Sequence, residues 1–133
     1  MSLTPNFTLL EFATRDKPGG PKRVPVNSQI ATNLRELAEN LEVLRKEIAA
    51  PIIIVSGWRD VPHNTRVKGA KNSQHLYGKA ADIRVVGVTP GVVADTIHRL
   101  IDRGEMKEGG VGLYPHKGFV HYDIRGKNAR WNG

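Results

Sequence analysis

Residues 28–55 read SQIATNLRELAENLEVLRKEIAAPIIIV and carry the clearest structural pattern in the chain. Large aliphatic side chains recur in the first part at intervals of four, three, four, three and four: Ile30, Leu34, Leu37, Leu41, Leu44 and Ile48. This spacing places them on one face and predicts a helix over residues 28–49, with Asn27 or Ser28 as its cap and Pro51 beyond its end. Three heptads also suit a coiled coil, but in a chain of this length we expect the stripe to pack on a sheet.

The segments after this helix predict that sheet. Ile52–Val55 is a β-branched run bounded by proline and glycine, which is typical of a buried strand. Further strands are predicted at residues 80–86, 111–114 and 119–124, the last two joined by a turn at 115–118. A second helix is predicted from Thr89-Pro90, a capping residue followed by proline, to about Gly104. The predicted fold class is therefore α+β, with two main helices against a small, mostly antiparallel sheet.

Two segments lack a regular apolar pattern. Residues 1–27 are rich in turn formers, and we expect them to wrap around the domain as an N-terminal arm. Residues 56–79 hold mainly polar residues, glycine and histidine, and are expected to form a loop. A loop of this length inside a compact domain usually carries function.

Length and composition restrict the class of protein. With 133 residues, 39% of them hydrophobic and 25% charged, the chain is expected to form one globular domain, residues 1–133. The absence of cysteine excludes disulfides, thiolate metal sites and cysteine nucleophiles. The formal charge of +7 favours an anionic partner such as nucleic acid, anionic lipid or a bacterial cell wall, without selecting among them. No apolar run approaches the ~20 residues of a membrane span.

Two histidines and an aspartate form the main candidate site. His75 precedes a predicted strand and Asp82 lies inside it, and Gly78 permits a turn that brings the two side chains together. His121 lies in the last predicted strand, on the same face as Asp123. If these strands are neighbours, two histidines and one carboxylate meet and leave a fourth position open, as in a catalytic zinc site.

Arg59 follows the buried strand at residues 52–55, so its guanidinium would project over the end of the sheet as a planar donor for a carboxylate or an oxyanion. Each of these features also has an ordinary structural explanation. A histidine near a strand end is usually a surface or hydrogen-bonded side chain, and Asp82 could pair with Arg84 or Arg125. No role is assigned to the remaining histidines, His63, His98 and His116.

A resemblance to a known family rests on two motifs, Ser73-x-His75-x-x-Gly78-x-Ala80-x-Asp82 and the later Phe119-Val120-His121-Tyr122-Asp123. Together they resemble the zinc D-Ala-D-Ala carboxypeptidase family of peptidoglycan peptidases, which includes phage endolysins and the D-Ala-D-Ala dipeptidases of vancomycin resistance. The upstream segments 55–59, 63–64 and 69–73 are similar to the family's strand and active-site loop, so the likeness covers about residues 28–125. Either motif alone would be a weak signal, but the combination is specific.

The resemblance implies a fold like that of the D-Ala-D-Ala peptidases and of their hedgehog relatives in animal signalling. It also implies one zinc ion per chain, since His75, Asp82 and His121 match the family's three zinc ligands. Arg59 matches the arginine that stabilises the developing oxyanion or binds the substrate. Ser73 matches a serine near the amino end of the substrate.

One departure from the family concerns the catalytic base. The classical members of the family place a glutamate, aspartate or histidine two or three residues before the last zinc ligand, where this chain has Gly118 and Phe119. The nearest ionisable residue on the same face is Asp123, an arrangement that resembles a short His-x-Asp subgroup of the family. Asp123 is therefore predicted to be the general base or its closest partner. The alternative is that it only orients His121 or pairs with Arg125.

The function that the resemblance implies is a zinc metallopeptidase that hydrolyses peptide bonds of peptidoglycan stem peptides. It would act as a D,D-carboxypeptidase or as an endopeptidase of the phage endolysin type. Alternative hypotheses are hydrolysis of a free D,D-dipeptide, a non-catalytic zinc-containing module that binds the cell wall, and nucleic-acid binding, which only the charge favours. We expect a monomer with no specific nucleic-acid partner. Residues 1–6 show no signal-peptide pattern, so we expect a cytoplasmic pool before release to the cell wall or periplasm.

Overall fold

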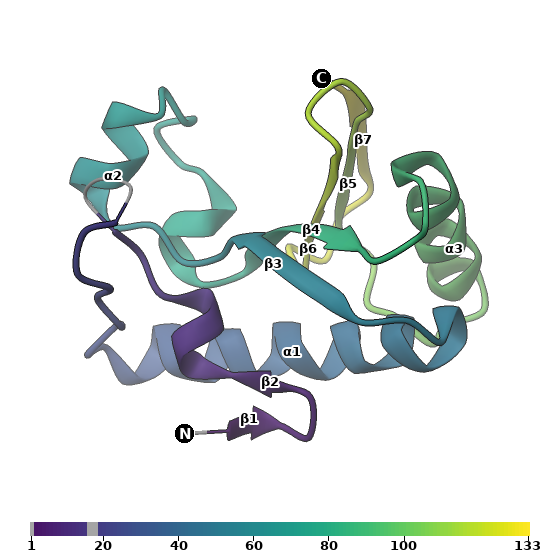
Figure 1. Ribbon diagram of the computed structural model, residues 1–133, viewed down its shortest axis with the longest axis horizontal. Coiled ribbons are helices and arrows are strands. Elements are labelled where there is room, and N and C mark those ends of the chain that lie inside the picture. The colour runs from purple at the N-terminus through teal and green to yellow at the C-terminus, as the bar shows by residue number, and fades with distance from the viewer. Residues whose placement is uncertain (1, 16–18) are drawn as a thin grey trace.

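The computed structural model describes residues 2–15 and 19–133 and has an α+β fold (Figure 1). Its helices are α1 (Ser28–Ile48), α2 (Val61–Arg66) and α3 (Pro90–Asp102), with the 3-10 helices η1 (Leu9–Phe12) and η2 (Gln74–Tyr77). Its strands are β1 (Ser2–Thr4), β2 (Phe7–Thr8), β3 (Ile52–Ser56), β4 (Ala80–Val85), β5 (Gly110–Tyr114), β6 (Phe119–Asp123) and β7 (Ala129–Asn132). The predicted fold class is confirmed, and a short third α-helix is added to the two that the sequence predicted.

The main sheet has five strands in the order β3-β4-β6-β5-β7. All neighbouring pairs are antiparallel except β5 and β7, which run parallel. The register of β4 and β6 pairs Asp82 directly with His121. Because successive side chains point to opposite faces, their neighbours Ile83 and Val120 lie on the other face, where both are fully buried. One face of the sheet therefore carries the polar candidates and the other forms the core.

The long helix α1 agrees closely with its prediction. The Asn27 side chain accepts hydrogen bonds from the backbone N–H groups of Gln29 and Ile30, and the helix ends at Ala49 in the left-handed region (φ 56°). Four leucines of the apolar stripe are fully buried: Leu34, Leu37, Leu41 and Leu44. In Figure 1, α1 runs beneath the sheet and α3 lies beside it, and both helices contribute to one hydrophobic cluster.

The N-terminal arm lies against α1. Strands β1 and β2 form an antiparallel pair, and Figure 1 shows them along the lower side of the molecule, next to the helix. Leu3, Phe7 and Phe12 from this segment are buried in the same hydrophobic cluster as the leucines of α1. The arm thus contributes apolar side chains to the core. None of the described helices is long and apolar enough to cross a membrane.

Residues 56–79 are more ordered than the sequence pattern indicates, so the expectation of an irregular loop is wrong. The Asp60 side chain caps α2 by accepting from the His63 N–H, and a proline in the first turn favours the helix. Only Asn64 is buried in this six-residue helix, so no apolar periodicity marks it. Strand β7 was not predicted either, since its four residues include a single large hydrophobic side chain.

Candidate metal centre

Three elements bring His75, Asp82 and His121 together. His75 lies in η2, Asp82 in β4 and His121 in β6, and one potential ligand atom from each lies within 4.8 Å of the others. Asp82 Oδ1 is 3.4 Å from His75 Nε2 and 3.2 Å from His121 Nδ1. All three side chains are buried. The structure therefore unites the three residues that the sequence identified as candidate metal ligands.

The turn that carries His75 is held at both ends. Ser73 Oγ accepts a hydrogen bond from the His75 N–H at 3.2 Å and so caps η2. Gly78 ends the turn in the left-handed region (φ 72°), and an added Cβ there would lie 2.8 Å from two atoms of Ile30 in α1. The Arg59 N–H donates to the His75 carbonyl at 3.1 Å. These contacts fix the histidine relative to the sheet.

Both imidazoles are oriented by a partner on the nitrogen that faces away from Asp82. His75 Nδ1 lies 2.7 Å from the Gly57 carbonyl oxygen, which can only accept, so Nδ1 carries the proton. His121 Nε2 lies 2.7 Å from Asp123 Oδ2, and an ionised carboxylate likewise requires the proton on Nε2. When both imidazoles are neutral, His75 Nε2 and His121 Nδ1 each direct a lone pair toward Asp82.

This donor set fits a metal cation. Two imidazole lone pairs and a carboxylate face one another without a proton between them, an arrangement that a cation or protonation of an imidazole must stabilise. Burial alone would raise the pKa of Asp82, but a proton on His121 or His75 that bonds to this carboxylate outweighs burial and lowers the pKa well below its usual range. Asp82 is therefore an anion at neutral pH. Two nitrogen ligands, one oxygen ligand and an open fourth position are typical of catalytic zinc.

Arg59 lies beside this group. Its Nη2 is 3.3 Å from Asp82 Oδ2, and its side chain is 15% exposed. Nε donates to Ser56 Oγ and Nη1 to Asn64 Oδ1, at 3.3 and 3.4 Å, so the guanidinium is held by contacts from β3 and α2. Burial lowers the pKa of Arg59, while Asp82 and Tyr114 raise it. The guanidinium remains a cation that can meet a negatively charged oxygen.

Asp123 is completely buried behind His121. Its Oδ1 accepts from the N–H groups of Gly110 and Arg125 and from Arg125 Nε, and its Oδ2 accepts from Arg125 Nη2 and His121 Nε2. Burial would raise its pKa, but the bonds from His121 and Arg125 outweigh burial and lower the pKa. Both oxygens are thus occupied by donors. This geometry favours the orienting role over proton transfer.

Three aromatic side chains, Trp131, Tyr114 and Phe119, form an aromatic wall beside the candidate metal centre that the sequence did not predict. The Trp131 ring in β7 lies 4.9 Å from the His121 ring, between centroids, and its Nε1 donates to the Tyr114 hydroxyl at 2.7 Å. Tyr114 in turn stacks on Phe119 with ring centroids 4.7 Å apart. Gly112 gives the indole its place, since an added Cβ would lie 2.4 Å from Trp131 Nε1. In the sequence, the glycine at position 112 inside a predicted strand indicates that another group can approach the backbone closely there.

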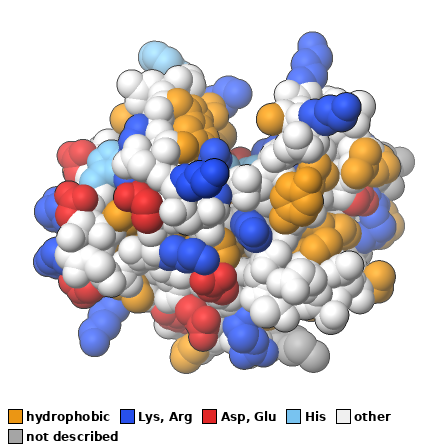
Figure 2. All heavy atoms as spheres, turned by 180° about the vertical axis from the view of Figure 1, so that it is seen from behind, with side chains coloured by type: hydrophobic (Ala, Val, Ile, Leu, Met, Phe, Trp, Pro, Cys, Tyr) orange, Lys and Arg blue, Asp and Glu red, His pale blue; other side chains and the backbone are white. Residues whose placement is uncertain are grey.

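The three candidate ligands line a cavity of about 570 Å³. Ser73 lines it too, together with the aromatic wall and four basic residues: Arg59, Lys68, Lys117 and Arg125. Among the described residues, Asp82 is the one acidic side chain in this lining. Figure 2 shows the molecule hollowed at its upper edge between two lobes, with Lys and Arg side chains on both rims. The cavity is therefore open to solvent and suited to an anionic ligand.

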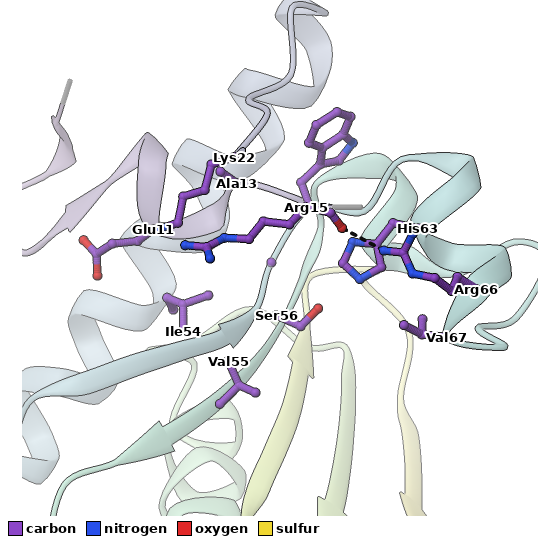
Figure 3. Close-up of a pocket in the computed structure, with 12 residues that line it drawn as sticks. Glu11, Ala13, Arg15, Lys22, Ile54, Val55, Ser56, His63, Arg66 and Val67 are labelled. Atoms are coloured by element: carbon purple, nitrogen blue, oxygen red, sulfur yellow. Dashed lines mark hydrogen bonds between the residues drawn. The ribbon is translucent and has the colours of Figure 1, made fainter. Parts of the chain in front are cut away.

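A second cavity, of about 430 Å³, lies on the other side of the β3 end. Arg15 and Lys22 reach it from the arm, whereas His63 and Arg66 reach it from α2 (Figure 3). His63 Nδ1 lies 2.6 Å from Thr14 Oγ1, and burial together with the charges of Arg66 and Arg59 lowers its pKa. His63 therefore belongs to the contact between α2 and the arm and is not part of the metal centre.

Comparison with known proteins agrees with this geometry. The sequence profile of peptidase M15 matches residues 5–123. A protein from Haemophilus influenzae named probable peptidoglycan L,D-endopeptidase MepK is 31% identical over 129 residues, which cover 93% of this chain and 63% of the relative. The peptidoglycan L,D-endopeptidase MepK of Escherichia coli K12 is 31% identical over 86 residues, 61% of this chain and 43% of that protein. The chain spans less than two thirds of the length of these relatives.

The profile match and the buried histidines and aspartate point to the same conclusion. The match covers both sequence motifs and every residue of the candidate metal centre. The strand register then explains why residues 39 positions apart, Asp82 and His121, act as one group. The chain belongs to the peptidase M15 family, the zinc D-Ala-D-Ala peptidases and related peptidoglycan peptidases.

Proposed function

We propose that this protein is a zinc-dependent endopeptidase that hydrolyses peptide bonds in the stem peptides of peptidoglycan. The observation that carries the proposal is the buried group of two oriented imidazoles and an ionised carboxylate in a chain of the M15 family. The names of the two relatives favour endopeptidase over carboxypeptidase activity and an L,D-bond as the target. The basic rim of the cavity suits stem peptides, which carry several carboxylates.

His75, Asp82 and His121 would hold the zinc ion. When bound, zinc polarises a carbonyl group and makes water a nucleophile at neutral pH. The chain's own residues prepare this site: Gly57 and Asp123 fix the tautomers of the two histidines, so that each offers a lone pair. Asp123 is thus proposed as a positioning residue.

Arg59 is proposed to stabilise the oxygen that becomes negatively charged as the peptide carbonyl is attacked. Its guanidinium is desolvated, lies beside the ligand Asp82 and lines the cavity. In a site that excludes water, one such donor typically changes the rate by about 10²–10³-fold. Ser73 also lines the cavity, and we propose that it contacts the amino side of the substrate.

A second function is favoured by the state of Asp123. Because donors occupy both carboxylate oxygens and no acidic residue besides Asp82 lines the described cavity, the site offers no evident carboxylate base. A zinc-containing module that binds stem peptides without cleaving them is consistent with this observation. The two functions share the ligand and differ in turnover.

Digestion of purified peptidoglycan separates them. Zinc-loaded protein, protein treated with a chelator, and His121→Ala would each be incubated with sacculi and with purified cross-linked muropeptides, and the products identified by mass spectrometry. New amino termini within the stem peptides, absent with His121→Ala, are expected for a peptidase. Sedimentation with sacculi without products would support the binding module. Neither binding nor cleavage would contradict both.

A further inference from the structure

The Tyr114 hydroxyl combines two properties that the proposed chemistry has not used. Tyr114 is the last residue of β5 and lines the cavity that holds the candidate ligands. Its ring is held by stacking on Phe119, with centroids 4.7 Å apart and planes 23° from parallel. Its hydroxyl oxygen accepts a 2.7 Å hydrogen bond from Trp131 Nε1. The position of the hydroxyl is therefore fixed by two aromatic neighbours.

The direction of the hydroxyl proton follows from the chemistry of tryptophan. An indole N–H donates and never accepts, so the Tyr114 O–H proton cannot point toward Trp131. Within residues 2–15 and 19–133, the bond from Trp131 is the one hydrogen bond that this hydroxyl makes. The proton is thus available to an acceptor that enters the cavity. Accepting a bond from Trp131 also polarises the hydroxyl and strengthens it as a donor.

Trp131 connects this donor to the metal centre. Its ring packs against the His121 ring at 4.9 Å between centroids, and it rests on the sheet where Gly112 lacks a side chain. Arg125, which bonds to Asp123, also lies over the indole, 5.6 Å from the ring centroid. The same indole therefore contacts a candidate ligand and fixes the Tyr114 hydroxyl, so the two are held at a constant separation.

We propose that Tyr114 is a substrate-contacting residue whose hydroxyl donates a hydrogen bond to the scissile carbonyl oxygen as that oxygen becomes negatively charged, with Arg59 as the other donor. This inference rests on the proposed peptidase function and adds a residue to it. Tyr114 and Arg59 line the same cavity, as expected for two donors that face one substrate group. A phenol suits this position because it donates a proton without adding a charge.

The test is Tyr114→Phe, which removes the hydroxyl and keeps the stacked ring. Tyr77→Phe is the matched control, since Tyr77 is 46% exposed and lies outside the cavity lining. We expect Tyr114→Phe to lower kcat by about 10²-fold, the typical effect of one oxyanion donor, with unchanged zinc content and a smaller change in KM. Tyr77→Phe should match the wild type. A kcat within about threefold of wild type in Tyr114→Phe would overturn the proposal.

Two further measurements do not depend on turnover. In ¹H–¹⁵N spectra the indole N–H of Trp131 should shift in Tyr114→Phe, while that of Trp58 should stay in place, because only Trp131 bonds to the phenol. Titration of zinc-free protein with purified muropeptides should show weaker binding to Tyr114→Phe than to Tyr77→Phe. If the wild type binds but does not cleave, the peptidase function fails, and this binding difference still supports the Tyr114 contact. If the wild type neither binds nor cleaves, or if it binds without cleaving and both variants bind equally, the Tyr114 contact is contradicted.

Discussion

The two cavities on either side of the β3 end are similar in size and differ in chemistry. The first, of about 570 Å³, holds titratable side chains that are buried and bonded to one another. The second, of about 430 Å³, is lined by residues of β3 and by charged side chains that reach it from the N-terminal arm and from α2. Both contain histidine and arginine. Only the first directs two imidazole lone pairs and a carboxylate at one point.

This difference shows what distinguishes the proposed reaction site from the other cavity. Histidine and arginine line both cavities, whereas only the first has imidazole nitrogens oriented toward a carboxylate. In the first cavity every outward-facing nitrogen has a fixed partner, so the inward-facing atoms are left for a ligand. In the second, His63 bonds to Thr14 and Arg66 donates to the Arg15 carbonyl, so these groups join the arm to α2. The contrast can be tested by substitutions on each side.

Removal of a candidate ligand should have the largest effect. His121→Ala is expected to abolish stoichiometric zinc binding, because two ligands remain where tetrahedral zinc needs three from the protein. His116→Ala is the matched control, since His116 is exposed in the β5–β6 turn. Zinc content measured by atomic emission, with circular dichroism to confirm folding, checks this. If His121→Ala retained one zinc per chain, His121 would not be a zinc ligand. The first cavity would then not be distinguished from the second by this set of ligands.

Arg59→Lys should have the second-largest effect on activity. Lysine keeps the charge but loses the planar guanidinium that contacts Ser56, Asn64 and Asp82 together. We expect kcat to fall by about 10²–10³-fold with zinc content close to wild type. Steady-state kinetics on a purified muropeptide measures kcat, and parallel metal analysis measures the zinc content. An unchanged kcat/KM would assign Arg59 a structural role.

Asp123→Asn distinguishes orientation from proton transfer. The asparagine amide would donate to His121 Nε2, which moves the ring proton to Nδ1, the atom that faces Asp82. We therefore expect zinc affinity to fall by about 10–100-fold. Competition with a chromogenic chelator measures this, and thermal unfolding shows whether the variant folds.

A general base gives a different result in the same variant. Zinc affinity would then stay nearly intact while the rate fell by about 10²–10⁴-fold. If Asp123→Asn does not fold, Arg125→Gln removes a donor from both carboxylate oxygens and leaves the His121 contact in place. Normal zinc affinity and full activity in the folded variant would contradict both roles of Asp123.

The smallest effect is expected in the second cavity. Arg66→Ala removes a hydrogen bond between an exposed side chain and the Arg15 carbonyl. Surface substitutions usually change free energies by less than ~0.5 kcal/mol, so activity should stay within about twofold of wild type. The same muropeptide assay measures it. A tenfold rise in KM would show that this cavity also contacts the substrate.

The sequence predicted the elements whose patterns are long or repetitive. The leucine stripe of α1 and the β-branched run of β3 were placed within a residue or two. The candidate ligands were found because two motifs with fixed spacing carry them. Short elements were missed, since α2 buries only Asn64 and β7 consists of four residues.

The aromatic wall could not be predicted for a different reason, because its contacts depend on which strands pair in the sheet. Trp131 meets Tyr114 only because β7 pairs in parallel with β5, across a connection of fourteen residues that includes β6. Nothing local in either segment indicates this pairing. Gly112 indicates where a close contact can form, but the sequence does not show that Trp131 is the side chain that occupies this space.

The pairing of β4 with β6 has a consequence for how the protein can fail. Asp82 and His121 face each other because the two strands pair in register from Ala80 to Ile83. A slip of one residue in either strand would turn its ligand toward the hydrophobic core and expose a buried aliphatic side chain in exchange. A chain with this slip would keep at most two of the three candidate ligands together, fewer than tetrahedral zinc needs from the protein. If the chain binds zinc as proposed, metal content would report this strand register during expression, refolding or storage without any substrate.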